Sequence, residues 1–477
     1  MLIALPKLPL PSSESITRAL LELGRTLGDS KVLTGDACAT YARDESEATG
    51  RVPAAVVLAA NTEDVRRTLE IAERTGVPVT PRAGGTGRTG GAVPVVGGIV
   101  LATEAMKQVK EINAKDLLAV VEPGVVTGDL HALVEREGFF YPPDPNSLAS
   151  CCIGGNVAEN AGGPRAFKYG VTREYVLGLE TCLVGGRVIR SGKRTVKGVT
   201  GYDVTALLVG SEGTLGVFTE VTLRLVPKPP EVATVLALFD DVRHAGAAVS
   251  ALVARGLVPR CLEMLDAATL DAVRAQKVAI DPRAKGMLLI EVDGEAGTIS
   301  LLLEQIADVV SRGEGLVDLL AAQDASQRAR LWEARRALSP ATRKLAKYKL
   351  SEDIVVPRSR IGELLDGVDA IGARTSVRHL TYGHAGDGNF HVNFLWNDER
   401  ERPLVDQAIE ALMRLTLSLG GTLTGEHGIG LSKAAYMPLE QSEDLLALQR
   451  DIKRVFDPKQ LLNPGKIFPE RPGHGAC

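Results

Sequence analysis

Two histidines separated by six residues flank a short glycine-rich turn in the last third of the chain. In GHAGDGNFH, His384 and His391 stand on either side of Gly-Asp-Gly, a spacing that can return two imidazoles to one face of adjoining strands. Glu426, in the later sequence GEH, adds a carboxylate, and two histidines with one carboxylate suit Zn²⁺, Mn²⁺ or Fe²⁺. The spacing alone leaves open the alternative that both histidines are hydrogen-bonded core residues.

A second feature that could do chemistry is the glycine-rich stretch PRAGGTGRTGG, residues 81–91, which contains G-x-G-x-x-G at Gly85, Gly87 and Gly90. A Rossmann dinucleotide loop requires a helix to begin inside this motif. The following residues, 92–100, are β-branched and interrupted by proline, so no helix begins there. No Gly-Lys-Ser/Thr follows either, which excludes a P-loop. We therefore expect a loop whose successive backbone N–H groups bind an anion without a helix.

The elements that must position these residues fall into two patterns. An apolar strand from Pro53, a helix from the N-cap Asn61 to Gly76 and a second extended segment lead into the glycine-rich loop. Beyond the Pro227–Pro230 cluster, strands and helices alternate in a way that predicts an antiparallel sheet flanked by helices. The predicted elements there are strands at 232–239 and 286–292 and helices at 241–255, 297–311, 323–345, 401–418 and 439–455.

Composition excludes several classes of protein. The 477 residues are 45% hydrophobic and carry a net charge of −4 without long single-sign blocks, so neither a nucleic-acid partner nor a membrane surface is indicated. The proline-interrupted N-terminus lacks a basic region, which makes a signal peptide an unfavoured interpretation, and no apolar run is long enough to span a membrane. Six cysteines without C-x-x-C spacing indicate reduced thiols, so we expect a cytoplasmic protein.

Eight motifs occur in a fixed order between about residues 35 and 469, and together they carry a resemblance to a known family. They are PRAGGTGRTGG, PPDPNS, IGGNVAENAGG, KYGVTREYVLGLE, TGYDVTALLVGSEGTLGVFTEVTL, GHAGDGNFH, GEHGIGLSK and DPKQLLNPGKIF. The chain resembles the FAD-linked oxidases of the vanillyl-alcohol-oxidase/PCMH superfamily. Its branch includes D-lactate dehydrogenases, the glycolate oxidase flavoprotein subunit and D-2-hydroxyglutarate dehydrogenase.

The resemblance implies an α+β fold with a PCMH-type FAD-binding domain of two α/β subdomains at residues 1–229. A substrate or cap domain built on an antiparallel sheet with flanking helices, and carrying the metal site, would follow at 230–440. A C-terminal helix and tail at 441–477 would return to the FAD domain. Cys151-Cys152 does not match the cysteinyl-flavin motif and no histidine lies in the loop, so we expect FAD to be bound non-covalently.

The resemblance also implies which residues contact FAD. The loop would wrap the pyrophosphate through its backbone, later motifs would line the flavin and its phosphates, and the GSEGTLGV motif would meet the adenosine. The implied FAD-contacting residues are Pro81, Arg82, Ala83, Gly84, Gly85, Thr86, Gly87, Gly91, Pro143, Asp144, Ser147, Gly154, Gly155, Asn156, Gly163, Tyr169, Gly170, Glu212, Gly213, Gly216, Val217 and Asn463.

The same resemblance assigns the two histidines and Glu426 to a divalent metal site of the 2-hydroxy-acid branch. A divalent cation lowers the pKa of bound water from about 15.7 to about 7, and a chelated α-hydroxyl should respond similarly. His427, beside the ligand Glu426, is then the expected general base, because its ordinary pKa lies near neutral pH. Arg335 matches the family's carboxylate-binding arginine, and Lys349 is a second catalytic candidate.

These features predict an FAD- and metal-dependent D-2-hydroxyacid dehydrogenase or oxidase, with D-lactate or glycolate as leading substrates and hydride transfer to flavin N5. Two alternatives stay open: a flavoprotein acting on another alcohol, and an electron-relay FAD subunit of a glycolate oxidase-type complex. No iron–sulfur cysteine pattern is present, so a relay would need partner proteins. The electron acceptor could be a quinone, a cytochrome, an electron-transfer flavoprotein or oxygen, and the chain could form a homodimer or a hetero-complex.

Overall fold

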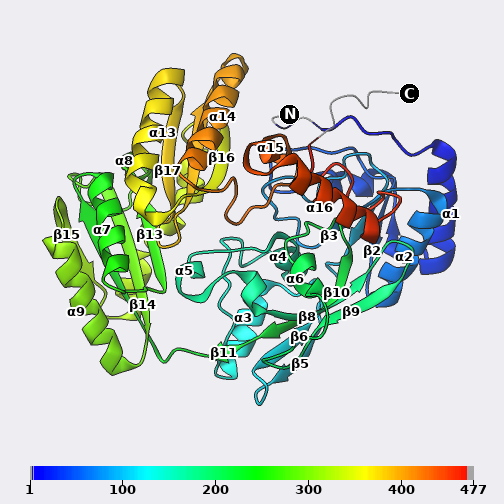
Figure 1. Cartoon of the computed structure of the whole chain (residues 1–477), viewed down its shortest axis with the longest axis horizontal. Coiled ribbons are helices and arrows are strands. Elements are labelled where there is room, and N and C mark those ends of the chain that lie inside the picture. Colours follow the sequence, from blue (N-terminus) through cyan, green and yellow to red (C-terminus); the bar gives the residue numbers. More distant parts are fainter. Residues whose placement is uncertain (1–2, 4, 470–477) are drawn as a thin grey trace. The chain divides into compact units, whose positions relative to one another are not determined.

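The computed structural model describes residues 3 and 5–469, which fold into an α+β protein as predicted (Figure 1). The chain divides into two compact units that each contain more than one chain segment. Unit 1 comprises residues 1–162, 171–228 and 426–477, and unit 2 comprises residues 163–170 and 229–425. The sequence places domain boundaries after residues 229 and 440, whereas the units divide after residues 228 and 425. No helix in the described part of the chain is both long and apolar enough to cross a membrane.

The first sheet of unit 1 positions the glycine-rich loop. Its order is β1-β2-β4-β3, and β2, β4 and β3 are parallel. Helix α2 (Thr62–Thr75) begins at Asn61, whose side chain accepts the N–H of Asp64, and ends at Gly76 in the left-handed conformation. Strand β3 (Val79–Arg82) then leads directly into the loop. The remaining strands of this sheet are β1 (Val32–Leu33), β2 (Ala55–Leu58) and β4 (Ile99–Ala102).

The second sheet of unit 1 is antiparallel, in the order β5-β6-β10-β8-β9, and a two-stranded ribbon pairs β7 with β11. The strands are β5 (Val109–Asn113), β6 (Leu118–Val121), β7 (Phe139–Phe140), β8 (Val176–Cys182), β9 (Val188–Gly192), β10 (Val217–Arg224) and β11 (Val226–Pro227). The other helices of unit 1 are α1 (Ser13–Leu27), α3 (Thr127–Arg136), α4 (Ile153–Glu159), α6 (Val204–Leu208), α15 (Met437–Glu440) and α16 (Glu443–Phe456).

Unit 2 is built on one seven-stranded antiparallel sheet, as the alternation of strands and helices predicts, in the order β15-β12-β14-β13-β17-β18-β16. The strands are β12 (Glu231–Phe239), β13 (Cys261–Leu265), β14 (Gly286–Gly294), β15 (Leu316–Ala321), β16 (Tyr348–Val355), β17 (Arg378–His384) and β18 (Asn389–Trp396). The helices are α5 (Ala166–Tyr169), α7 (Val242–Ala254), α8 (Ala267–Arg274), α9 (Ala296–Arg312), α10 (Ala325–Leu331), α11 (Glu333–Arg336), α12 (Leu338–Arg343), α13 (Ile361–Thr375) and α14 (Arg402–Ser418).

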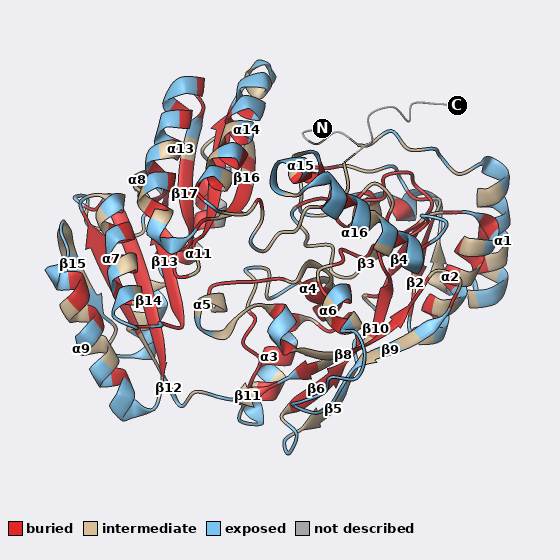
Figure 2. Cartoon of the chain, viewed as in Figure 1, coloured by how far each residue is buried: buried red, intermediate tan, exposed pale blue. Residues whose placement is uncertain are grey.

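Burial alternates along the helices of unit 2 and is nearly continuous along its central strands (Figure 2). Because side chains on a strand alternate between the two faces, Leu265, Tyr382 and Leu395 share one face, which packs against residues of α8, α11 and α12. His391 is the register partner of Tyr382, and His384 lies two residues after Tyr382 on the same strand. They therefore lie on the face of the sheet that these short helices cover.

Candidate functional site

The predicted histidine pair is brought together by the hairpin of β17 and β18. His384 ends β17 and pairs with Asn389, while His391 pairs with Tyr382, so the two histidines are diagonal neighbours on one face. Their ring centroids are 5.6 Å apart, their planes are nearly perpendicular, and both residues are buried. A ring nitrogen of each lies within 4.8 Å of one on the other. The tight turn between the strands uses Gly388 at φ +79°, where any side chain would be strained.

A buried glutamate that sequence reasoning missed stands behind His384. Glu263 of β13 is fully buried, and its Oε1 lies 2.5 Å from Nδ1 of His384. Burial alone would raise the pKa of Glu263, but the His384 ring and the Arg335 guanidinium outweigh it and lower that pKa to about 2. A carboxylate on the far nitrogen of a metal-ligating histidine is a recurrent arrangement, because it fixes the tautomer and the orientation of the ring. The donor set of unit 2 thus fits a divalent metal.

The structure places the predicted Arg335 beside this carboxylate. Arg335 lies in α11, is buried, and donates from Nε to Oε2 of Glu263 at 2.5 Å. Its guanidinium also lies over the ring of Tyr382, 5.5 Å from the centroid. Lys349, on β16, donates from Nζ to Oγ1 of Thr342 at 3.3 Å. Arg335 and His384 therefore bind the two oxygens of one carboxylate, that of Glu263.

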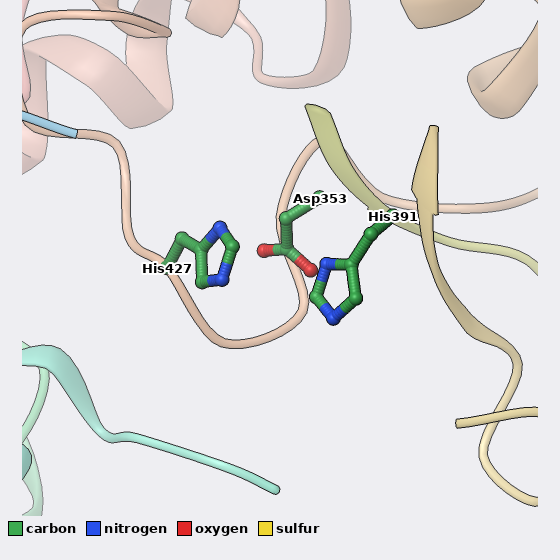
Figure 3. A group of neighbouring side chains, drawn as sticks. All are labelled: Asp353, His391 and His427. Atoms are coloured by element: carbon green, nitrogen blue, oxygen red, sulfur yellow. The ribbon is translucent and has the colours of Figure 1, made fainter. Parts of the chain in front are cut away.

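A second carboxylate missed from the sequence, Asp353 of β16, is fully buried and holds the chain just before the GEH motif. Asp353 accepts from Oγ1 of Thr424 at 2.7 Å and from the N–H of Gly425 at 2.8 Å. It is also the register partner of His391, and the two side chains face one another (Figure 3), with ligand atoms within 4.8 Å. The predicted ligand Glu426 is the residue that follows Gly425. Glu426 is therefore covalently joined to Gly425, whose N–H is bound by Asp353, the register partner of His391.

Unit 1 holds the GEHGIG segment by a separate set of contacts. The carboxylate of Glu212 accepts the N–H of Ile429 at 2.8 Å and that of Gly430 at 2.7 Å. Burial raises the pKa of Glu212 although these N–H groups act in the opposite direction. Nε2 of His427 lies 3.7 Å from Oε1 of Glu426. The sequence predicts Glu212 as an adenosine contact, whereas its observed hydrogen bonds fix the residues that follow the predicted base.

Thr89 joins the glycine-rich loop to the same segment. Its hydroxyl donates to the backbone carbonyl of His427 at 3.1 Å, and its own carbonyl accepts the N–H of Leu431 at 2.8 Å. Asn463, in the left-handed conformation at φ 44°, donates from Nδ2 to the carbonyls of Gly91 and Glu212. The loop, the GEHGIG segment and the C-terminal LLNPGK motif are thus fastened together within unit 1.

The glycine-rich loop itself retains the donors that an anion would need. Within the described part of the chain, the backbone N–H groups of residues 83–91 donate to no protein acceptor. Residues 83–87 are only half-buried, while 89–91 are buried. Successive backbone N–H groups that are open to a ligand can form an anion-binding site. The loop therefore fits the pyrophosphate of FAD.

Arg82, just before this loop, is engaged by the protein. Its guanidinium donates to the carbonyl of Arg43 at 2.6 Å and lies over the ring of Tyr41. Gly84 approaches the backbone of Ser150, since a Cβ there would lie 2.7 Å from that carbonyl oxygen. The contacts with Arg43 and Tyr41 direct the Arg82 side chain toward residues 41–43.

The other predicted cofactor residues are distributed over both units. Gly154, Gly155 and Asn156 form the first part of α4, and Asn156 donates to Oγ1 of Thr127 at 2.6 Å. The Pro143 carbonyl is bonded to Nε2 of His131 at 2.9 Å, which gives that histidine a structural partner. The remaining predicted residues of unit 1 are Pro81, Ala83, Gly85, Thr86, Gly87, Asp144, Ser147, Gly213, Gly216 and Val217. Gly163, Tyr169 and Gly170 belong to the short segment 163–170, which packs within unit 2.

This short segment is anchored to β14. The hydroxyl of Tyr169 donates to Oδ2 of Asp293 at 2.7 Å, and Nζ of Lys168 pairs with Oδ1 of the same carboxylate. Asp293 is buried and also faces the guanidinium of Arg260 at 3.3 Å. Tyr169, a predicted flavin contact, thus has its hydroxyl committed to unit 2.

The C-terminal motif places a buried lysine among carboxylates of unit 1. Nζ of Lys466 donates to the carbonyl of Val93 at 2.6 Å and to Oδ1 of Asn463 at 3.0 Å. Burial lowers the pKa of Lys466 to about 7, against the opposing effect of Asp44, Glu212 and Glu159. Asn463, an implied FAD contact, and Lys466 of the same motif are both buried.

Two family models match the chain. The model described as "FAD binding domain" matches residues 53–192, and the model described as "FAD linked oxidases, C-terminal domain" matches residues 228–467. The chain is 41% identical over 433 residues to the protein named glycolate oxidase subunit GlcD of Bacillus subtilis (strain 168), covering 90% of this chain and 92% of that protein. It is 36% identical over 416 residues to the D-lactate dehydrogenase of Archaeoglobus fulgidus, covering 86% and 90% of the two chains.

Solved structures show the same fold at low sequence identity. p-Cresol methylhydroxylase superposes with a TM-score of 0.80 at 17% identity, covering 96% of this chain and 98% of that one. The 4-ethylphenol oxidase from Gulosibacter chungangensis gives a TM-score of 0.79 at 21% identity, covering 97% and 99%. These matches confirm the predicted PCMH-type fold. The chain belongs to the FAD-linked oxidases, flavin-dependent oxidoreductases whose FAD-binding domain and C-terminal domain it carries in that order.

Proposed function

We propose that this protein oxidises a D-2-hydroxy acid to the 2-oxo acid, with D-lactate or glycolate as the leading substrates. The single observation that carries this proposal is the buried His384–His391 pair with Glu263 behind His384. A pair of imidazoles oriented by a carboxylate suits a divalent cation, and such a cation lowers the pKa of an oxygen group bound to it. The relatives named glycolate oxidase subunit and D-lactate dehydrogenase support a 2-hydroxy acid as substrate.

In this proposal His384, His391 and Glu426 hold Zn²⁺, Mn²⁺ or Fe²⁺, and His427 takes the proton of the substrate hydroxyl. Non-covalently bound FAD would supply the hydride acceptor, its N5, so the acid would lose one proton to His427 and the C2 hydride to the flavin and become the 2-oxo acid. The backbone of His427 is fixed by Thr89, which favours a defined ring position.

The substrate carboxylate needs a cation, and we assign this role to Arg335, with Lys349 as a second candidate. Arg335 is buried and shares Glu263 with His384, so its position is tied to that of a proposed metal ligand. An acid whose hydroxyl and carboxylate stand on adjacent carbons can meet both groups at once. FAD would be held by unit 1, mainly through the N–H groups of residues 83–91.

A second candidate function concerns the fate of the electrons. The relative from Bacillus subtilis is named a subunit, which favours a protein that passes its electrons to a partner rather than to oxygen. The acceptor would then be a second protein or a quinone. Reduction of the flavin by substrate would be the same in either case.

The test is anaerobic bleaching of the protein-bound flavin by a panel of D- and L-2-hydroxy acids, before and after treatment with a chelator. We expect D-acids to bleach the flavin, chelator to abolish the bleaching, and added Zn²⁺ or Mn²⁺ to restore it. His391→Ala should behave like the chelated protein. His379→Ala is the matched control, because His379 lies on the same strand as His384 and near Asp369. Bleaching that persists in the chelated protein or in His391→Ala would refute the metal role.

A further inference from the structure

Glu263 places two different side chains with its two oxygen atoms. Oε1 accepts a hydrogen bond from Nδ1 of His384, and Oε2 accepts one from Nε of Arg335, each at 2.5 Å. A carboxylate is a rigid planar group, so the two partners cannot move independently while both bonds hold. Glu263 itself is fixed by β13, where it pairs with His384 of β17 and with Leu289 of β14.

We propose that Glu263 is a positioning residue that sets the separation between the metal ligand His384 and the substrate-binding Arg335. The proposal rests on the function proposed above and deepens it, because this separation would select acids whose hydroxyl and carboxylate are on adjacent carbons. A 3-hydroxy acid, with one more carbon between these groups, would not match both. Since a carboxylate oxygen only accepts, Nδ1 of His384 carries the proton of that bond and a neutral ring presents Nε2 as the ligand atom.

Two substitutions of Glu263 separate the number of acceptor oxygens from their position. Glu263→Gln offers one acceptor and one donor, so it can satisfy the N–H of His384 or that of Arg335 but not both. Glu263→Asp keeps two acceptors but withdraws them by about 1.5 Å, the length of one carbon–carbon bond. Both variants leave the partners' own side chains in place.

Glu291→Gln is the matched control. Glu291 is a buried carboxylate on the neighbouring strand β14 that faces Nε of Arg260 at 3.3 Å and accepts from Nε1 of Trp332 at 2.9 Å. Its substitution also disturbs a buried carboxylate–arginine pair in unit 2 without touching His384. It therefore reports the general effect of such a change on folding and on FAD content.

The experiment measures Zn²⁺ affinity of the chelator-stripped, FAD-loaded protein with a competing indicator, together with KM and kcat for D-lactate and for D-3-hydroxybutyrate. We expect Glu263→Gln to bind Zn²⁺ about 10- to 100-fold more weakly, to raise KM for D-lactate and to narrow the preference for D-lactate over the 3-hydroxy acid. Glu263→Asp should lie between wild type and Glu263→Gln, and Glu291→Gln should keep wild-type Zn²⁺ affinity and substrate preference.

Three outcomes would overturn the proposal. Wild-type Zn²⁺ affinity in a folded Glu263→Gln or Glu263→Asp variant would remove the role of Glu263 while leaving the proposed function standing. An equal loss in Glu291→Gln would show a general effect of disturbing unit 2. Wild-type protein that binds no metal would remove the proposed function and this inference together. If Glu263→Gln fails to retain FAD, Glu263→Asp alone decides between these outcomes.

Discussion

A methyl group added at Gly430 should disturb the contact between the glycine-rich loop and the segment that carries His427. Gly430 has φ +51°, and a Cβ there would lie 2.4 Å from the backbone oxygen of Thr89. The left-handed conformation costs a non-glycine residue about 1–2 kcal/mol. Ordinary contact begins at 3.4 Å, so Thr89 or Gly430 must also move by about 1 Å, and overpacking of this kind typically costs about 1–3 kcal/mol.

The displacement strains two hydrogen bonds of the segment. These are the bond from the N–H of Gly430 to Glu212 at 2.7 Å and the bond from the N–H of Leu431 to the carbonyl of Thr89 at 2.8 Å. We therefore expect Gly430→Ala to be destabilised by about 2–5 kcal/mol in total, the sum of the two costs. A misplacement of about 1 Å near the reacting groups can slow a reaction about 100-fold, so flavin reduction by D-lactate should slow by about that factor.

Gly35→Ala isolates the conformational part of this effect. Gly35 has φ +62°, and a Cβ there would meet no atom within 4 Å. Rapid-mixing measurements of flavin bleaching and thermal unfolding would be made on both variants. We expect Gly35→Ala to lose only about 1–2 kcal/mol and to keep its rate. If Gly430→Ala behaves like Gly35→Ala, the close approach to Thr89 does not position His427 and the reasoning fails.

Two further predictions concern pH and the flavin. Burial raises the pKa of Asp266, the N-cap of α8, from 3.8 to about 6, against the hydrogen bonds from Thr269 and from the N–H of Thr381. The folded state therefore holds more protons on this group than the unfolded state, so its stabilisation is present below about pH 4 and is lost as the pH rises through 6, by about 3 kcal/mol at most. Asp266→Asn, which keeps a capping oxygen, should remove this decline in unfolding measurements between pH 4 and 6, and parallel pH curves for variant and wild type would contradict the assignment. We expect FAD to be held without a covalent bond, because Cys152 is a buried packing residue whose thiol pKa burial raises to about 11. Acid precipitation of the protein should therefore release all FAD into the supernatant. Flavin retained in the pellet would show a covalent link.

The sequence predicted those parts of the site that local spacing determines. The pairing of His384 with His391 follows from a single hairpin, and the absence of a helix directly after Gly90 follows from a β-branched, proline-interrupted stretch. Helices α9 and α14 follow from their apolar periodicity. Each of these predictions depends on residues within about fifteen positions of one another.

The two carboxylates that organise the site could not be predicted in this way. Glu263 reaches His384 only because β13 pairs with β17, and Asp353 reaches Gly425 from β16 across more than seventy positions of sequence. The sole sequence signal for Glu263 is a charged residue in the middle of the apolar strand CLEML. Such a residue has to be paired when buried, because an isolated buried charge is strongly unfavourable. A lone acid in a buried strand therefore indicates a partner, although the identity of the partner depends on strand order.

Two buried carboxylates, Asp353 and Glu212, have a common role, since each fixes backbone groups next to residues that we propose to be functional. Asp353 holds Gly425 on one side of Glu426-His427, and Glu212 holds Ile429 and Gly430 on the other. Backbone N–H groups captured by a buried carboxylate form strong, charge-assisted bonds that leave little freedom to the residues between them. These bonds restrict the backbone on either side of Glu426 and His427. Substituting Asp353 should therefore impair the rate of flavin reduction more than the affinity for FAD.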